Sequence, residues 1–147
     1  MSDAFIVNRR VQFAETDIAG VLHFSNYYRL MEEAECAFWR SLSLSVFTPD
    51  GAGHISWPRV ATSCDYFAPA FFEDELTLAL RLIRLGEKSA TFEVDMRRDE
   101  VGLARGRNTA VCCATTPGSF APVPIPPRIR TLLEPLVRKP FEPIRGE

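Results

Sequence analysis

The sequence lacks an apolar run long enough to cross a membrane, because polar or charged residues interrupt every apolar stretch well before the ~20 residues that a spanning helix needs. The first residues, Met1 to Phe5, lack a basic region followed by an apolar run, so we expect no secretory signal. A basic surface is missing too, since 17 Lys and Arg residues stand against 19 Asp and Glu residues and give a net charge of −2. Nucleic-acid binding as a main activity needs such a surface. We therefore expect a cytoplasmic protein with no membrane partner and no nucleic-acid partner.

Cysteine and histidine are scarce. The chain has 4 cysteines, none at CxxC spacing, and its 2 histidines are His23 and His54. Adjacent strand residues face opposite sides, so Cys112 and Cys113 do not both reach one site. We expect no metal and no cofactor, and free thiols in a reducing compartment. The GxSxG, P-loop, HExxH and GxGxxG motifs are also absent, which disfavours the enzyme classes that depend on them.

The length of 147 residues, with 46% hydrophobic and 24% charged residues, is ordinary for one domain that buries its own core. The prolines are unevenly placed, because 8 of the 11 lie from Pro117 onward. Proline fixes φ and removes a backbone donor, which favours an extended path. We therefore predict a folded domain over 1–116 and a proline-rich C-terminal tail over 117–147, with a short helix within 129–138.

The apolar residues change period along the chain. Alternation predicts a first strand over 5–14, and spacings of three and four predict an amphipathic helix from Ser25 or Asn26 to Leu42. The turn sequences Thr-Pro-Asp-Gly and Gly-Ala-Gly within 43–57 predict a loop. Alternation then returns in four further strands, over 58–67, 74–85, 88–98 and 103–115. The acidic residues expected on the wet face of the helix are Glu32, Glu33 and Glu35.

This order predicts an α+β fold in which an antiparallel five-stranded sheet, its last four strands a meander, wraps around one long helix. Clean alternation indicates that one face of the sheet is buried and the other is wet. The apolar stripe of the helix and the apolar face of the sheet bury each other. One helix does not cover both faces and both edges, so we also predict a homodimer or homotetramer.

Candidate chemistry lies in the polar loop that leads into the helix, which holds Thr16, Asp17 and His23. A helix N-terminus offers unpaired backbone N–H groups and a partial positive charge, which can hold a developing oxyanion. A carboxylate, ionised at neutral pH, attacks a carbonyl carbon directly or deprotonates a water molecule. A thioester needs little more, because a thiol with a pKa of about 8.5 leaves without strong acid help. The loop therefore fits thioester hydrolysis better than amide cleavage.

The run from Phe13 to Tyr27 resembles the active-site segment of the 4-hydroxybenzoyl-CoA thioesterase family of hotdog-fold proteins. The shared pattern is an aspartate, Asp17 here, then alanine or glycine, a glycine, two aliphatic residues, an aromatic residue or histidine, and shortly an Asn-Tyr or Ser-Tyr pair that opens the helix. The stretch Asp65–Ala70, followed by Asp74, is similar to the strand after the helix in the same family. The resemblance implies a hotdog fold and an acyl-CoA thioesterase. Relatives with a segment similar to Asp65–Ala70 hydrolyse 1,4-dihydroxy-2-naphthoyl-CoA, so an aryl group is favoured over fatty acyl or carrier-protein thioesters.

The resemblance also implies residue roles. Asp17 is the expected catalytic carboxylate, as nucleophile or general base, and backbone amides around His23 and Phe24 are the expected oxyanion hole. Many relatives have tyrosine or tryptophan at the position of His23, so a direct role of its imidazole does not follow. The expected substrate contacts are Thr16, Gly20, Asn26 and Tyr27 at the loop and the helix start. Apart from the resemblance, Arg84 and Lys88, or Arg97 and Arg98, are candidates for the phosphates of coenzyme A, because arginine and lysine match phosphate well.

Two other functions stay open. A hotdog hydratase or dehydratase carries a D-x-N-P-x-H-like motif in which Asp and His are five apart, whereas Asp17 and His23 are six apart. A non-enzymatic acyl-CoA-binding protein would use the same fold without turnover. Release of thiol from a panel of acyl-CoA esters distinguishes these three functions.

Overall fold

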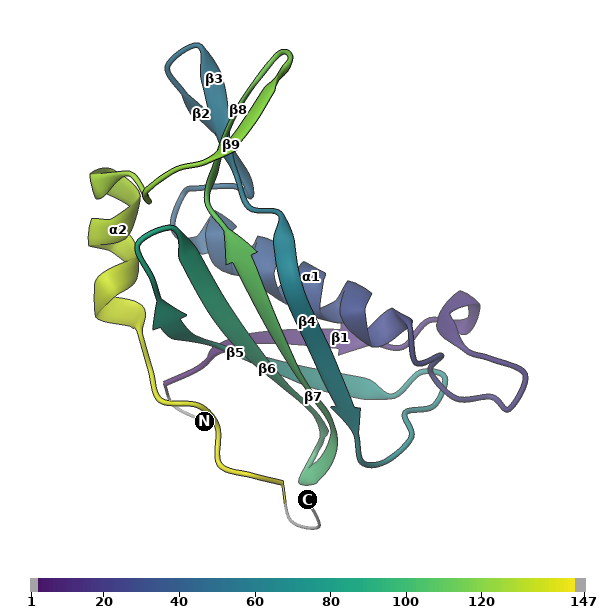
Figure 1. Cartoon of the computed structure of the whole chain (residues 1–147). Helices are drawn as coiled ribbons and strands as arrows, with labels where there is room; N and C mark the ends of the chain where they lie inside the picture. The colour runs from purple at the N-terminus through teal and green to yellow at the C-terminus, as the bar shows by residue number, and fades with distance from the viewer. Residues whose placement is uncertain (1–2, 145–147) are drawn as a thin grey trace.

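The computed structural model describes residues 3–144 and has the predicted α+β architecture. Its main helix is α1 (Asn26–Ser41). Its main sheet has five antiparallel strands in the order β1-β5-β6-β7-β4. These strands are β1 (Phe5–Arg10), β4 (Arg59–Tyr66), β5 (Glu75–Leu85), β6 (Ser89–Arg98) and β7 (Val101–Val111). Figure 1 shows α1 lying across one face of this sheet, here called the inner face.

The inner face and α1 bury each other, as the two apolar periods predict. The helix contributes Leu30, Met31 and Phe38 to this core. The sheet contributes alternate residues of β5 and β6, namely Leu76, Leu78, Leu80, Leu82, Phe92, Val94 and Met96. The Met31 side chain packs on Gly106 of β7, where an added Cβ would lie 2.2 Å from its Sδ, so a larger residue at this position would displace Met31. No helix within residues 3–144 has both the length and the apolar character to span a bilayer.

One helix residue that was expected on the wet face is buried. Glu35 is 2% exposed and points from α1 toward the sheet, where Arg59 and Asn108 bind its carboxylate. Glu32 and Glu33 are exposed as expected. Glu35 lies at the border of the apolar stripe, and the helical period alone does not show that it is buried while its neighbours are exposed. Its partners lie on strands that are distant in the sequence.

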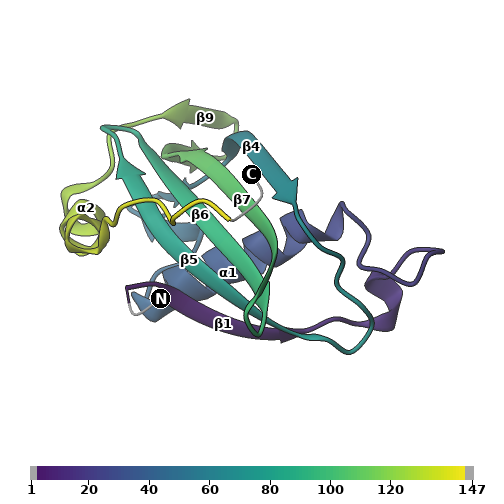
Figure 2. The ribbon, with the colours of Figure 1, turned by 90° about the horizontal axis from the view of Figure 1, so that it is seen from below.

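The last four strands of the sheet do not form the expected meander. β4 precedes β5 in the chain, yet it pairs with β7 at the opposite edge, with Thr62 opposite Asn108. The connection over 67–74 runs around one end of the sheet and returns the chain to β5 (Figure 2). Alternation indicates which side chains share a face, but not which strands pair. As a result β4 is an edge strand that pairs only with β7 among the described residues.

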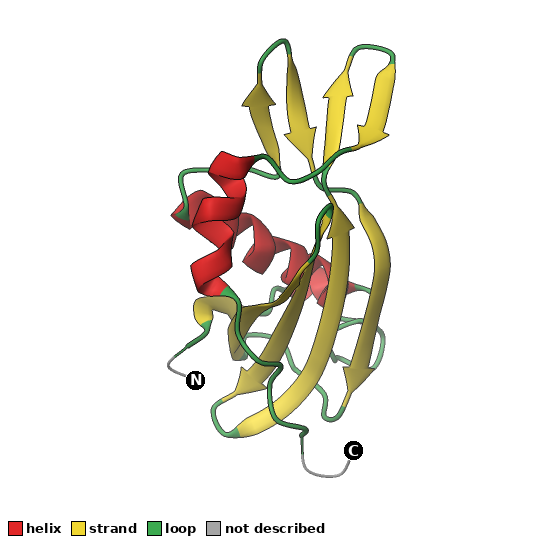
Figure 3. Ribbon diagram, turned by 60° about the vertical axis from the view of Figure 1, so that its left-hand side comes forward, coloured by secondary structure: helices red, strands yellow, loops and turns green. Residues whose placement is uncertain are grey.

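A second sheet of four antiparallel strands, the small sheet, projects beyond the end of the main sheet (Figure 3). In the order β2-β3-β8-β9, its strands are β2 (Phe47–Asp50), β3 (Gly53–Ser56), β8 (Cys113–Thr116) and β9 (Ser119–Pro122). The prediction of a loop over 43–57 is therefore wrong. The turn residues are present, with Gly51 at a φ of 58°, but they close a hairpin. The two four-residue segments of this hairpin, FTPD and GHIS, show no apolar alternation and contain turn residues, so the sequence does not mark them as strands.

The chain beyond β7 also departs from the prediction. The single strand expected over 103–115 is divided at Cys112, whose N–H donates to the carbonyl of Lys88 (2.6 Å), after which β8 pairs with β3 of the small sheet. The expected boundary at residue 116 falls within the β8–β9 hairpin. A short helix is present as α2 (Pro127–Leu133), followed by a 3-10 turn over 134–136 that contains Pro135.

Residues 137–144 cross the outer face of the main sheet, so the expectation of a wet outer face is wrong at its centre (Figure 2). Val137 forms a parallel bridge with Leu82, and the Phe141 N–H donates to Oε1 of Glu93 (2.7 Å). Glu93 and Asp95 are consequently 3% and 0% exposed. Arginines on β6 and β7 pair with both carboxylates and offset the cost of burying them.

Candidate active site

The loop between β1 and α1 folds into a short hairpin over 15–23, here called the Asp17 hairpin. The His23 N–H donates to the Glu15 carbonyl (2.9 Å), and the Asp17 N–H donates to the Val21 carbonyl (2.8 Å). Gly20 closes the turn at a φ of 81°, and its N–H donates to the Asp17 carbonyl (2.9 Å). A positive φ favours glycine, which explains its place in the motif. The predicted site residues Thr16, Asp17 and Gly20 are thus brought together.

The two carboxylate oxygens of Asp17 have different surroundings. Oδ1 accepts the N–H groups of Ala19 (2.8 Å) and Val21 (3.3 Å), as in an Asx turn. Oδ2 accepts no hydrogen bond within residues 3–144. One oxygen therefore fixes the side chain, and the other is available to a reacting group.

Two ties fasten the Asp17 hairpin to the rest of the protein. Arg9, at the end of β1, binds both carboxylate oxygens of Glu15 (2.8 and 2.6 Å) and also reaches Glu33 of α1 (2.9 Å). These hydrogen bonds lower the pKa of the Glu15 carboxyl. The Asn26 amide donates to the Glu15 carbonyl (2.8 Å). In the sequence Arg9 only interrupts an apolar face, so its role was missed there.

The amides at the helix start are not equally available. The N–H groups of His23 and Asn26 donate to the carbonyls of Glu15 and His23, both at 2.9 Å. The Ser25 N–H donates to the Nδ1 of His23 (3.2 Å). The Phe24 N–H has no acceptor within residues 3–144. Of the two amides expected at the oxyanion hole, that of His23 is engaged and that of Phe24 is unpaired.

The His23 imidazole acts on the backbone of its own turn. Because a backbone N–H only donates, the Nδ1 of His23 must accept from Ser25, which puts the ring proton on Nε2. The Ser25 hydroxyl also lies 2.8 Å from Nδ1. The imidazole stacks on the Phe24 ring with centroids 4.6 Å apart. These contacts hold the imidazole against the backbone at the helix start, and they predict a structural role for His23.

Replacement of His23 by phenylalanine is expected to lower kcat less than tenfold, because phenylalanine keeps the stacking on Phe24 and loses only the acceptor for Ser25. A hydrogen bond of this kind contributes about 0.5–1.5 kcal/mol. His23→Asn, which offers Oδ1 as an acceptor, is the matched variant and should retain still more activity. Steady-state rates of thiol release measure both. A loss in both variants as large as that of an Asp17 variant would contradict the structural role.

Two tyrosines support the helix start. The Tyr66 hydroxyl donates to the Phe24 carbonyl (3.0 Å), and its ring meets that of Tyr27 at 5.0 Å. Tyr27 is 3% exposed, so this predicted substrate contact is mostly covered by protein. Burial raises the pKa of both phenols, and so they stay protonated as donors. The hydrogen bond of Tyr66 to the Phe24 carbonyl had no signal in the sequence.

The predicted phosphate contacts Arg84 and Lys88 lie at the far end of the main sheet from the Asp17 hairpin. They flank the β5–β6 turn, whereas the hairpin follows Arg10, which pairs with Glu75 at the start of β5. The 11 residues of β5 separate these ends by roughly 35 Å. Within one protomer these cations therefore do not meet Asp17.

The other predicted cations lie at the Asp17 end. Arg98 donates to the Pro69 carbonyl (3.0 Å) and to Oδ2 of Asp74 (2.7 Å). Both residues belong to the connection between β4 and β5, which is hydrogen-bonded to the Asp17 hairpin. Arg97 pairs with the buried Asp95 (2.6 Å). Both guanidinium groups already hold carboxylates, so they contribute less net charge to this end than the sequence indicates.

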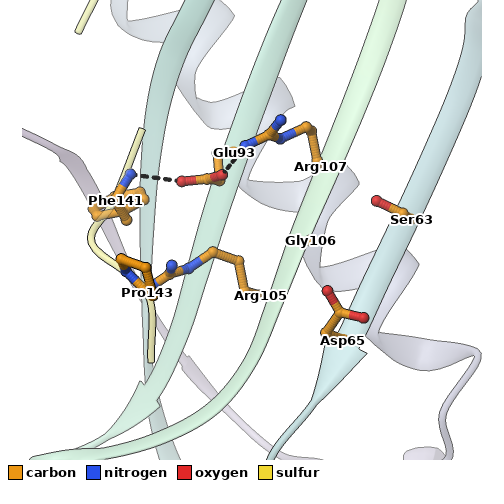
Figure 4. A pocket seen from close by; sticks show the side chains of 8 residues that line it. All are labelled: Ser63, Asp65, Glu93, Arg105, Gly106, Arg107, Phe141 and Pro143. Carbon is orange, nitrogen blue, oxygen red and sulfur yellow. Dashed lines mark hydrogen bonds and ion pairs between the residues drawn. The ribbon is translucent and has the colours of Figure 1, made fainter. Parts of the chain in front are cut away.

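A cavity of about 360 Å³ on the outer face is separate from the Asp17 hairpin (Figure 4). It lies between β4, β7 and the C-terminal residues, with Ser63, Phe141 and Pro143 on its wall. Its arginines, Arg105 and Arg107, pair with buried carboxylates at 2.7 Å. The cavity therefore offers no unpaired cation for a phosphate, and we assign it to the packing of the C-terminal segment.

Comparison with known proteins agrees with this geometry. A sequence profile of the thioesterase-like superfamily matches residues 11–133, which include the Asp17 hairpin and α1. A 1,4-dihydroxy-2-naphthoyl-CoA hydrolase of Synechocystis sp. is 31% identical over 124 residues, which cover 83% of this chain and 90% of that protein. A solved gentisyl-coenzyme A thioesterase has a TM-score of 0.74 and 28% identity, covering 86% of this chain and 99% of that one. A solved thioesterase superfamily protein of Jannaschia sp. CCS1 has a TM-score of 0.79 and 28% identity, covering 92% and 94%.

The fold and these similarities define a hotdog-fold thioester hydrolase. The chain belongs to the thioesterase-like superfamily. The resemblance seen in the sequence and the predicted enzyme class are thereby confirmed. The acyl group and the roles of individual residues stay predictions.

Proposed function

We propose that the protein hydrolyses acyl-CoA thioesters to a free acid and coenzyme A, with Asp17 as the reacting carboxylate. The supporting observation is the junction of the Asp17 hairpin and α1, which holds both an unpaired carboxylate oxygen and the unpaired N–H of Phe24 among the described residues. Unpaired groups on a rigid junction are available to the reacting atoms without first breaking a bond. The Phe24 N–H donates to the carbonyl oxygen as negative charge develops there.

Two routes use the same groups. In the nucleophilic route, Oδ2 of Asp17 adds to the thioester carbon, the C–S bond breaks, and the coenzyme A thiolate leaves with the electron pair. Water then hydrolyses the mixed anhydride. In the general-base route, Asp17 takes a proton from water as the hydroxyl oxygen adds, and the C–S bond breaks from the tetrahedral intermediate. Both routes consume one water molecule and release one acid and one thiol.

Exposed aromatic residues near the Asp17 hairpin favour an aryl acyl group. Phe24 and Tyr66 are 63% and 43% exposed, and Phe71 and Phe72 on the neighbouring connection are 46% and 50% exposed. Flat apolar walls stack on an aryl ring. The relatives named for 1,4-dihydroxy-2-naphthoyl-CoA and gentisyl-coenzyme A act on aryl thioesters, which agrees with this selection.

Thiol release from a panel of CoA esters is expected to show higher kcat/KM for benzoyl or naphthoyl esters than for acetyl or butyryl esters. A ring contact of about 0.5–1.5 kcal/mol corresponds to roughly two- to tenfold in rate. Fatty acyl esters that exceed every aryl ester would contradict the aryl selection but not the role of Asp17. Binding without any thiol release would contradict the hydrolase and favour an acyl-CoA-binding protein.

The free edge of β4 supports a homodimer. Between Arg59 and Asp65, its residues Val60 to Cys64 carry no charge, and Val60 is 62% exposed. The other edge strand, β1, ends in two adjacent arginines, Arg9 and Arg10. Charged residues protect an edge from pairing, and uncharged ones do not. Two copies would pair antiparallel through β4 about a two-fold axis. Figure 1 shows the β1–α1 loop projecting past this free edge, so the Asp17 hairpin would lie at the interface.

Light scattering is expected to give twice the chain mass of 16.5 kDa over a concentration series. Ala61→Lys, which adds a charge to the exposed edge of β4, should shift the protein toward monomer by like-charge repulsion across the axis. Asn8→Lys on the exposed edge of β1 is the matched control and should leave the mass unchanged. A wild-type monomer, or dissociation by Asn8→Lys alone, would contradict pairing through β4.

A further inference from the structure

The two faces of the small sheet are covered differently. Thr48 and Ile55 lie on one face and are 7% and 1% exposed, and Ile55 belongs to the same buried cluster as Ile129 of α2. The opposite face carries Phe47, 49% exposed, with its ring stacked on that of His54 at 3.9 Å and an interplanar angle of 12°. An aromatic stack is therefore left open on the β2–β3 hairpin.

The open face of the small sheet is turned toward the free edge of β4. Figure 1 shows α2 on one side of the small sheet and β4 on the other. Ile55 belongs to the buried core of the protein, so the opposite face, which carries Phe47 and His54, is turned away from that core. In the proposed dimer, the second copy lies on that side.

Antiparallel pairing exchanges the ends of β4. The small sheet joins β4 at Arg59, through Trp57 and Pro58. At the other end of β4, Tyr66 donates to the Phe24 carbonyl, next to the unpaired Phe24 N–H. A two-fold axis through the middle of the strand sets the Arg59 end of one copy beside the Tyr66 end of the other. Each small sheet then lies beside the helix start of the partner.

Within the small sheet, the β2–β3 hairpin is the part on the helix side. Figure 2 shows β9 displaced from the main sheet toward its outer face, away from α1. Since the strand order is β2-β3-β8-β9, the β2 edge is at the opposite side, toward α1. The Asp17 hairpin leads directly into α1, so it lies on that same side.

We propose that the β2–β3 hairpin of one protomer completes the thioester site of the other, with the stack of Phe47 and His54 packing on a flat ring of the substrate. This inference rests on the proposed function. The ring is either the aryl acyl group or the adenine of coenzyme A, because both present the same π face. Specificity would then be set partly by residues that the protomer holding Asp17 does not supply.

Single substitutions test the contact. Phe47→Ala should raise KM for benzoyl-CoA roughly two- to tenfold, the range of one ring contact. Phe47→Leu keeps the bulk without the π face and should show a similar rise, which separates the contact from misfolding. Phe120→Ala is the matched control, since Phe120 is 61% exposed on β9, three strands and roughly 14 Å away. Equal effects of Phe47→Ala and Phe120→Ala would overturn the assignment.

Two further substrates identify the ring. The benzoyl thioester of N-acetylcysteamine lacks adenine, and acetyl-CoA lacks the aryl group. If the stack holds the acyl ring, Phe47→Ala raises KM for the first and leaves the second unchanged; if it holds adenine, the reverse applies. No change in KM for benzoyl-CoA itself would overturn the proposal.

A mixed dimer tests whether the hairpin acts across the interface. One subunit carries Asp17→Asn, the other carries Phe47→Ala, and two affinity tags isolate the heterodimer. The subunit with intact Asp17 then receives an intact Phe47 from its partner, so the mixed dimer should show the wild-type KM. The raised KM of the Phe47→Ala homodimer in this mixture would overturn the proposal. Full activity of the Asp17→Asn homodimer would instead refute the proposed function, so the two failures are distinguishable.

Discussion

Replacement of Asp17 by asparagine is expected to lower kcat for acyl-CoA hydrolysis by about 10²–10⁴-fold, the range that a positioned acid–base group contributes. Asparagine presents its Oδ1 to the same N–H groups of Ala19 and Val21, so the turn is kept. It removes the charged Oδ2, which has no partner within residues 3–144. The loss would therefore report on the chemistry rather than on folding. Initial rates of thiol release from benzoyl-CoA measure it.

Two companion variants define the meaning of that loss. Asp17→Ala removes the turn as well as the charge, so it should match the low kcat of Asp17→Asn and also lower the melting temperature. Asp99→Asn changes an exposed aspartate at a φ of 52°, a conformation that asparagine tolerates, and should leave kcat unchanged. Binding of coenzyme A should survive in all three variants. Wild-type rates in both Asp17 variants would rule out the carboxylate mechanism.

The elements that the sequence predicts well are those with a long apolar period facing one core. The helix predicted from Ser25 or Asn26 to Leu42 is Asn26–Ser41 in the structure. The strands predicted over 74–85 and 88–98 are 75–85 and 89–98. In each case, several turns or alternations repeat the same signal, so an error at one residue does not change the outcome.

The features that the sequence does not show depend on partners far along the chain. Asp95 alternates like a solvent-facing residue, and only the position of Arg105 and of the C-terminal segment explains its burial. In the sequence Arg9 only interrupts an apolar face, and its role becomes visible when the fold places Glu15 and Glu33 beside it. A polar residue in a periodic pattern is either exposed to water or buried against a polar partner, and periodicity does not distinguish these two environments.

The candidate site divides in the same way. The Asp17 hairpin is contiguous, so its turn, its Gly20 and its entry into α1 can be read from neighbouring residues. The sequence does not show that the Phe24 N–H is unpaired, because this depends on which acceptors the neighbouring N–H groups of His23 and Ser25 bind in the fold. The support from Tyr66 requires β4 to be at the far edge of the sheet, which local pattern does not specify.

The buried carboxylate of Glu35 joins three elements of the fold. Its Oε1 accepts the side-chain N–H of Asn108 on β7 (2.9 Å), and its Oε2 pairs with Arg59 on β4. The Thr62 hydroxyl donates to the other end of the Asn108 amide. α1 is thereby bound to β4, the strand at the proposed interface, and to its neighbour β7.

Replacement of Glu35 by alanine is expected to lower the free energy of unfolding by about 3–5 kcal/mol, the cost of breaking a buried pair. It leaves Arg59 and the Asn108 amide without their acceptor. The melting temperature should fall by roughly 6–20 °C, measured at one fixed protomer concentration because the protein is expected to dimerise. Glu32→Ala, on the same helix but exposed, should stay within about 0.5 kcal/mol of the wild type. Equal melting temperatures for Glu35→Ala and Glu32→Ala would show that the tie contributes nothing.

Glu35→Gln separates the charge of this carboxylate from its hydrogen bonds. Glutamine keeps an oxygen for Asn108, so it should cost less stability than alanine. Burial raises the pKa of the Glu35 carboxyl above its ordinary value of 4.5, against the opposing pull of Arg59. Between 4.5 and that raised value, the folded protein holds the proton more tightly than the unfolded chain, so wild-type stability falls as pH rises through this window. Glu35→Gln lacks this titration, and its melting temperature should therefore decline less over the same window; parallel curves for the two proteins would contradict the charge cost of burial at Glu35.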